Sequence, residues 1–155
     1  MEKKYYPIEI NAPIGHVFEA MLGLEDKVSY EKWTAAFNPT STYEGNWVKG
    51  GKMYFVGTDE EGNRGGMISE IAEYRVPEFV SIRHYGILKG DEEITSGEDV
   101  EKWAGGFENY HFTSNNGRTK VTVELDVLED FTSYFEETYP KALLILKAMI
   151  EDEFH

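Results

Sequence analysis

The sequence contains no cysteine. This absence excludes a disulfide framework, a thiolate metal site and a cysteine nucleophile together. The sequence also lacks an apolar run long enough for a signal peptide or a transmembrane helix. A chain of 155 residues is most simply one domain, here residues 1–155, and it buries enough surface to fold without disulfides or metals. We therefore expect a single cytoplasmic domain.

Positive charge is scarce as well. The chain has 15 Lys and Arg against 29 Asp and Glu, which gives a formal net charge of −14. Nucleic-acid binding needs a positive surface that displaces counterions from phosphates, and binding to anionic membranes requires the same. The composition therefore predicts neither a nucleic-acid partner nor a membrane partner. An excess of negative charge is typical of solubility rather than of a particular fold.

Motifs of known enzyme classes are missing too. The sequence has no Gly-x-Ser-x-Gly elbow and no phosphate-binding glycine loop. Its glycine pairs at 50–51, 65–66 and 105–106 have the pattern of turns or bulges. Metal-ligand spacing is absent from the four histidines, which are His16, His84, His111 and His155. We expect no catalytic motif, no metal and no cofactor.

The first part of the chain indicates a strand followed by two helices. Residues 5–11 favour a strand, Asn11 is a candidate helix cap, and Pro13 suits the first helical turn because it lacks an N–H. Apolar residues then recur at helical spacing as far as Gly23, a typical helix end. A second helix is predicted over about residues 24–36.

After the second helix the pattern changes to short strands separated by turn residues. The long connection 86–105 carries a possible short helix beginning near Ser96, and we predict that it forms a movable cover. From Phe131 onward the apolar residues return to helical spacing, and Pro140 predicts either a kink or a new helix start. The predicted strands span residues 42–48, 52–58, 65–75, 79–88, 106–114 and 119–128.

The order strand, two helices, six antiparallel strands and a long C-terminal helix defines an α+β fold, in which one face of the sheet packs on the last helix. Segments along nearly the whole chain match one family pattern: Ile10–Pro13 with Val17 and Phe18, Lys32–Thr34 with Phe37, Trp47 with Gly50 and Gly51, Gly66–Met67, Pro77–Phe79, His84–Gly86, Trp103 with Gly105, Glu108–Tyr110, Phe131, Tyr134–Phe135 and Tyr139–Leu143. In these segments the chain resembles the START-like superfamily, also called SRPBCC, and within it the bacterial relatives of the activator of the heat-shock chaperone ATPase.

The resemblance implies a helix-grip fold, in which a curved sheet holds the last helix and often leaves a cavity between them. Members of the superfamily bind lipids, hormones and polyketides, and a few are enzymes. By analogy, the resemblance also implies a chaperone as a regulatory partner. Because the matching residues are distributed rather than gathered in a catalytic motif, they support the fold more strongly than any chemistry.

The pair Asn116-Gly117 predicts a two-residue hairpin turn and thereby a strand register. Positions 115, 112, 110 and 108 then face 118, 121, 123 and 125, and one side of the hairpin carries Glu108 among apolar residues: Tyr110, Phe112, Val121, Val123 and Leu125. A carboxylate on an apolar face must be paired, neutral or near an opening. Glu108 is therefore either a strand-end residue that reaches solvent or a lysine, or a polar anchor inside a cavity.

Alternation in the strand 79–88 points Val80, Ile82 and His84 toward the same side. If this strand neighbours 106–114, His84 meets Glu108 or Tyr110. Such a histidine is either a satisfied core residue or one of the convergent polar groups by which a pocket orients a ligand.

Four aromatic residues cluster where the second helix gives way to turns and strands: Trp33, Phe37, Tyr43 and Trp47. One interpretation is core packing of the second helix against the sheet edge. The other is that they rim the mouth of a cavity, opposite Trp103 and Tyr139, where an apolar ring with a polar tip is well suited.

The favoured function is a binding module that encloses a small hydrophobic or amphipathic molecule between the sheet and the C-terminal helix. One alternative is an enzyme that uses the same cavity for acid–base chemistry by His84, Glu108 and Tyr110. Another is a regulatory partner of a chaperone, and a homodimer is compatible with the sequence. The residues predicted to bind the ligand are Trp33, Phe37, Trp47, His84, Trp103, Glu108, Tyr110, Phe112, Tyr139 and Leu143.

Overall fold

The computed structural model of the protein describes residues 1–154; His155 and the side chain of Phe154 lie outside the described part. The strands are β1 (Glu2–Ile10), β2 (Thr42–Gly45), β3 (Lys52–Thr58), β4 (Arg64–Arg75), β5 (Phe79–Lys89), β6 (Glu92–Ile94), β7 (Gly106–Asn115) and β8 (Arg118–Val127). The helices are α1 (Ile14–Leu22), α2 (Lys27–Thr34), α3 (Glu98–Glu101) and α4 (Thr132–Phe154), with a 3-10 turn at Glu129–Phe131.

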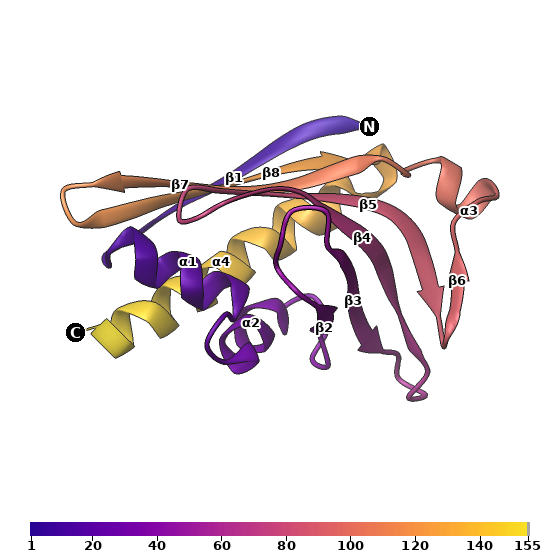
Figure 1. The fold of residues 1–155 in the computed structure, drawn as a ribbon, viewed down its shortest axis with the longest axis horizontal. Coiled ribbons are helices and arrows are strands. Elements are labelled where there is room, and N and C mark those ends of the chain that lie inside the picture. Colours follow the sequence, from indigo (N-terminus) through magenta and orange to yellow (C-terminus); the bar gives the residue numbers. More distant parts are fainter. Residues whose placement is uncertain (155) are drawn as a thin grey trace.

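The strands form one antiparallel sheet in the order β1-β8-β7-β5-β4-β3-β2, and the short β6 pairs with β5. The sheet curves over the long helix α4, and α1 and α2 lie on the same side of it (Figure 1). This is the α+β helix-grip architecture that the sequence predicts. Its concave face is therefore the face that can enclose a ligand. No helix in the described part of the chain is long and apolar enough to cross a membrane.

Helix α1 begins and ends at residues that fix the backbone. Pro13 stands before its first turn with φ of −65°, so Pro13 rather than Asn11 occupies the N-cap position of the helix. The backbone N–H of Asn11 instead donates to Glu151 Oε2 of α4 at 2.8 Å. Gly23 ends α1 in the left-handed region with φ of 69°, which confirms the expected stop.

Helix α2 has the side-chain cap that α1 lacks. Asp26 precedes it, and one of its carboxylate oxygens accepts the backbone N–H of Val28 at 2.9 Å. The capped helix starts at Lys27, within the predicted range 24–36. Its far end brings Trp33 against the sheet.

The hairpin of β7 and β8 has the predicted register. Asn116 and Gly117 have φ of 52° and 85°, the positive values that a type I′ turn requires at both central positions. Glu108 consequently faces Leu125, and Tyr110 faces Val123. The apolar side of this hairpin is buried: Tyr110, Phe112, Val121, Val123 and Leu125.

The connection 86–105 is more ordered than expected. Strand β5 continues to Lys89, and a turn at Gly90, which has φ of 63°, returns the chain as β6 along β5. The sequence analysis missed β6 because this strand has only three residues. The predicted short helix is present as α3, and its Val100 is fully buried.

Several boundaries differ from the sequence expectation. Strand β1, expected at 5–11, spans Glu2–Ile10. Strand β2 ends at Gly45, which has φ of 119°, so Trp47 stands in the turn rather than in a strand. Helix α4 runs through Pro140 without a new start. Pro140 leaves the carbonyl of Glu136 without its helical N–H, but both residues are exposed, so water can take that bond.

The core lies between the concave face of the sheet and the helices. Leu143, Leu146 and Ile150 of α4 are at most 1% exposed and pack there with the inner face of the β7–β8 hairpin. Phe18 of α1 meets Phe112 of β7 edge to face, with ring centroids 5.0 Å apart. These contacts fill the half of the molecule around α1 and leave open space nearer to α2.

Candidate functional site

The concave side of the sheet encloses a cavity of about 470 Å³ between β5, β7, α2 and α4. Aromatic side chains form much of its wall. Its most exposed lining residues, Met1, Phe131 and Tyr134, lie before β1 and around the start of α4, and we take them to mark its mouth. The lining residues used below are Met1, Tyr30, Trp33, Phe37, Phe55, Met67, His84, Ile87, Trp103, Glu108, Tyr110, Phe131, Tyr134, Phe135 and Tyr139. Its volume falls within the range of about 300–1,000 Å³ that is usual for small-molecule pockets.

A chain of hydrogen bonds crosses this otherwise apolar wall. Ser69 on β4 pairs with His84 on β5, and Ser69 Oγ lies 2.6 Å from His84 Nδ1. His84 Nε2 lies 3.0 Å from Glu108 Oε1 on β7. The hydroxyl of Tyr139 on α4 donates to the other oxygen, Glu108 Oε2. Three strands and the helix thus each contribute one group.

Glu108 is the centre of this chain. Its side chain is 18% exposed and that of His84 is 14% exposed, so both are largely withdrawn from water yet reachable from the cavity. The sequence left open whether Glu108 reaches solvent or a lysine, or serves as a polar anchor. The structure pairs it with His84 and Tyr139, on the cavity wall.

Three tyrosines near Glu108 are held in the neutral form. Burial raises the pKa of Tyr139 and Tyr110 well above the ordinary value, and the negative charge of Glu108 raises both further. Burial and the same charge also raise the pKa of Tyr30. A neutral phenol keeps its O–H, so each of these residues can donate a hydrogen bond into the site.

Seven of the ten residues predicted to bind a ligand line the cavity: Trp33, Phe37, His84, Trp103, Glu108, Tyr110 and Tyr139. The other three lie in the core. Trp47 packs on Tyr43 with ring centroids 5.4 Å apart, and Phe112 packs on Phe18. Leu143 is 1% exposed, one helical turn beyond Tyr139 on α4. We therefore place these three in the scaffold, and ligand contact by the other seven remains a prediction.

The structure divides the aromatic cluster between the core and the cavity wall. Tyr43 and Trp47 fill the core, and the Tyr43 hydroxyl donates to the carbonyl of Gly23 at 3.0 Å. Trp33 is 1% exposed, and its indole N–H donates to the carbonyl of Met21 at 2.9 Å. It also borders the cavity, as does Phe37.

Several residues of the site are absent from the sequence-based prediction. Ser69 is fully buried and holds His84, but a serine inside a strand gives no functional signal by itself. Tyr30 lies one helical turn before Trp33, and this spacing could have identified it as a residue on the same face. The mouth residues Phe131 and Tyr134 are 51% and 45% exposed, which is unusual for rings of this size.

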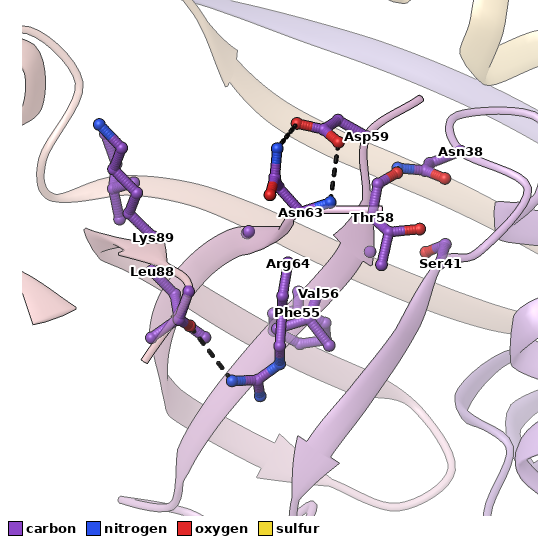
Figure 2. Close-up of a pocket in the computed structure, with 15 residues that line it drawn as sticks. Asn38, Ser41, Phe55, Val56, Thr58, Asp59, Asn63, Arg64, Leu88 and Lys89 are labelled. Atoms are coloured by element: carbon purple, nitrogen blue, oxygen red, sulfur yellow. Dashed lines mark hydrogen bonds between the residues drawn. The ribbon is translucent and has the colours of Figure 1, made fainter. Parts of the chain in front are cut away.

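A second depression, of about 950 Å³, lies beside the cavity at the ends of β3, β4 and β5 (Figure 2). It shares Ser41, Phe55 and Ile87 with the cavity. Several of its polar side chains are already paired within the protein. Asp59 Oδ1 accepts the N–H of Asn63 at 2.9 Å, and Arg64 forms an ion pair with Asp91 at 3.3 Å. We regard this open groove as an approach to the cavity rather than as the site.

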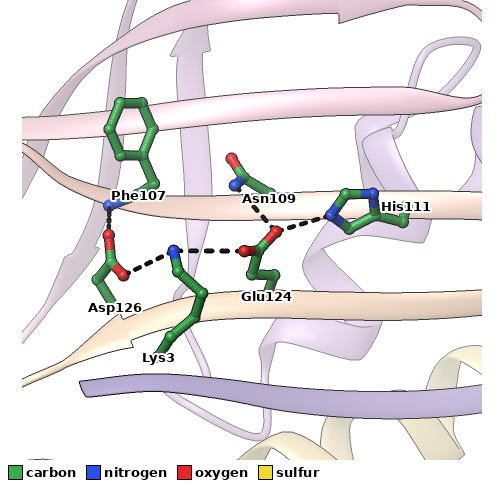
Figure 3. Close-up of polar contacts among 6 residues, drawn as sticks. All are labelled: Lys3, Phe107, Asn109, His111, Glu124 and Asp126. Atoms are coloured by element: carbon green, nitrogen blue, oxygen red, sulfur yellow. Dashed lines mark hydrogen bonds and ion pairs between the residues drawn. The ribbon is translucent and has the colours of Figure 1, made fainter.

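The outer face of the sheet carries a separate polar network (Figure 3). Lys3 of β1 bridges Glu124 and Asp126 of β8 at 3.3 Å and 3.1 Å. Glu124 also accepts from His111 of β7, with the atoms 2.8 Å apart, and Asp126 accepts the N–H of Phe107 at 2.8 Å. The network ties three strands together on the side away from the cavity, so we assign it to stability.

Comparison with known proteins supports the fold. No protein-family model and no curated protein matches the chain. Among solved structures, the Aha1 dimer from Colwellia psychrerythraea is 18% identical with a TM-score of 0.69, over 97% of this chain and 97% of that chain. A protein from Arthrobacter aurescens is 16% identical with a TM-score of 0.70, over 97% and 86%. CalU16 from Micromonospora echinospora is 14% identical with a TM-score of 0.64, over 96% and 73%.

Proposed function

We propose that this protein is a binding module for a small, mostly apolar molecule held between the sheet and α4. The observation that carries the proposal is the cavity of about 470 Å³, whose aromatic wall is crossed by one hydrogen-bonded group around Glu108. Binding pockets combine a largely apolar surface with a few fixed polar groups that orient the ligand. The pairing of Ser69, His84 and Tyr139 supplies that fixed polar group here.

The proposal extends to the family branch and the setting. The likeness to the Aha1 dimer supports a place beside bacterial Aha1-like proteins and a homodimer. We also propose a cytoplasmic location, as expected from the sequence. A chaperone partner rests on this likeness alone, and a pull-down with the purified protein tests it. The ligand-binding role rests on the chain's own cavity and is therefore the favoured function.

Acid–base catalysis is a second candidate because His84 is oriented on both sides, by Ser69 and by Glu108. A base held by a third group is the usual arrangement of an activated catalytic site. Native mass spectrometry separates the two functions. A molecule that copurifies with the protein is identified by its mass, and its mass is measured again after incubation with the purified protein. Conversion of that molecule by the wild type but not by His84→Ala supports an enzyme, and its unchanged release supports a binding module.

The experiment for ligand binding is a fluorescence titration with N-phenyl-1-naphthylamine, a neutral aromatic probe. We expect saturable binding of one probe per cavity. Ile87→Trp should weaken it by about tenfold or more, because Ile87 lines the cavity and the larger indole occupies volume that the probe needs. The control Ile145→Trp adds the same ring to the exposed side of α4. Equal binding by both variants, or none by the wild type, would contradict the proposal.

A further inference from the structure

The cavity wall carries an unusual set of charged groups. Among the described side chains that line the cavity, the carboxylates and imidazoles are those of Glu108, Asp126 and His84, and neither Lys nor Arg is present. The carboxylate oxygens of Asp126, however, are bound to Lys3 and to the N–H of Phe107 on the outer face. The nearest fixed charge for a ligand in the cavity is therefore the carboxylate of Glu108.

The hydrogen bonds of Glu108 can be formed without a positively charged partner. The Ser69 hydroxyl can donate to His84 Nδ1, so that His84 Nε2 carries the proton and donates to Glu108. A neutral imidazole satisfies both contacts in this arrangement. Because a carboxylate has about four acceptor positions, and His84 and Tyr139 use two of them, Glu108 can accept further donors.

The same set of charged groups disfavours an anionic ligand. A carboxylate or phosphate head group inside the cavity would lose its hydration and lie beside Glu108 without a Lys or Arg side chain to pair with it. Neutral phenols at Tyr30 and Tyr110 could donate hydrogen bonds to it, but they provide no opposite charge. Fatty-acid-like molecules are thus poorly matched to this wall.

Aromatic rings around Glu108 favour the opposite charge. Phe37 meets Tyr139 edge to face with centroids 4.9 Å apart, and Trp33 lies 6.2 Å from Tyr110. Ring faces attract an organic cation, and this attraction is stronger in a desolvated site. A carboxylate beside several rings is an arrangement that holds an ammonium group, and the remaining apolar wall holds the body attached to it.

We propose that the cavity selects a cationic amphiphile, an organic ammonium group joined to an apolar body. The ammonium group contacts Glu108 and the surrounding rings, and the apolar body extends along Phe37 and Phe135 toward the mouth at Phe131 and Tyr134. This inference rests on the proposed binding function and names the ligand class for the same site.

Three probes with one chain and different head groups test it: dodecylamine, 1-dodecanol and dodecanoate, each displacing bound N-phenyl-1-naphthylamine. We expect dodecylamine to displace the probe at a concentration about tenfold or more below that of dodecanoate, with 1-dodecanol between them. The measurement is made at high salt, where attraction to the acidic outer surface is screened.

Variants assign the preference to Glu108. Glu108→Gln should remove the advantage of dodecylamine over 1-dodecanol, with both competitors compared against the variant's own affinity for the probe. The control Glu129→Gln removes an exposed carboxylate next to Leu128 at the mouth and should leave that advantage unchanged. Circular dichroism confirms that each variant is folded.

The possible failures are distinguishable. If the wild type does not bind N-phenyl-1-naphthylamine, the binding function itself is wrong. If the probe binds but dodecanoate displaces it as well as dodecylamine does, the inference about ligand class is wrong, whatever the variants show. Retention of the amine preference by folded Glu108→Gln also overturns it.

Discussion

The Tyr139 hydroxyl, on the buried side of α4, donates a hydrogen bond to Glu108 Oε2 in the middle of the sheet. The same ring stacks on Tyr6 of β1, with centroids 5.2 Å apart and planes 7° apart. One side chain of α4 thus contacts both the edge strand and the carboxylate of the candidate site. Because the bond joins the helix to the wall of the cavity, we expect it to contribute both to stability and to the position of Glu108.

Tyr139→Phe removes that bond and retains the ring. Hydrogen bonds to charged groups contribute about 1.5–3 kcal/mol, so we expect the free energy of unfolding in urea to fall by about this amount. Tyr5→Phe is the control, because Tyr5 is 59% exposed on the outer side of β1, and it should cost less than about 0.5 kcal/mol. Equal stability of the two variants would mean that water replaces the Tyr139 hydroxyl without cost.

The helix α4 should be sensitive on one side and tolerant on the other. Leu146 is fully buried against the sheet, and Leu146→Ala should lower the free energy of unfolding by about 2–5 kcal/mol. Leu144 of the same helix is 59% exposed, so Leu144→Ala should cost less than about 0.5 kcal/mol. Urea denaturation measures both. If Leu146→Ala lowers the free energy of unfolding by less than about 0.5 kcal/mol, Leu146 does not face the sheet and the described side of α4 is wrong.

The hairpin register was predictable because Asn116-Gly117 permits positive φ at both turn positions, and the register in turn placed Glu108 among apolar residues. The approach of His84 to Glu108 also followed, from alternation along β5. These are local rules, and the residues concerned obey them. They sufficed to identify the sheet half of the candidate site.

Other parts of the site depend on tertiary contacts that no local pattern encodes. Tyr85 of β5 is an extra residue opposite the pair Ile68 and Ser69, so the alternation changes there and Ile87 lines the cavity together with His84. Glu108 is paired with Tyr139 of α4. This contact could not be predicted from the sequence, because packing sets the distance between the helix and the sheet. Trp47 and Phe112 lie in the core for the same reason.

The segment 95–105 should exchange its amide hydrogens faster than β7 and β8. It contains the single turn α3, and few contacts hold it: Val100 is buried, and the N–H of Gly105 donates to the carbonyl of His84 at 2.9 Å. Trp103, within this segment, lines the cavity, so saturation with N-phenyl-1-naphthylamine should slow the exchange if the segment is a cover. Hydrogen-exchange mass spectrometry reports both effects. Uniformly slow exchange across 95–127 without the probe would rule out a movable cover.

Acid stability should depend on Glu124, on the side of the sheet away from the cavity. The hydrogen bond from His111 lowers the pKa of the Glu124 carboxyl; partial burial opposes this, and contacts with Asn109 and Lys3 lower the pKa further (Figure 3). The folded state therefore releases this proton more readily than the unfolded state does. Its contribution to stability is present above the ordinary glutamate pKa of about 4.3 and is lost as the pH falls through the lowered folded value.

Glu124→Gln removes this titration. We expect the variant to be less stable than the wild type at pH 7 and to lose less stability between about pH 5 and pH 3, because the amide does not titrate. Urea midpoints measured across that range test this, with Glu60→Gln as the control, since Glu60 is exposed in the turn between β3 and β4. Parallel pH profiles for Glu124→Gln and the wild type would show that the contacts between β1, β7 and β8 do not depend on the charge of Glu124.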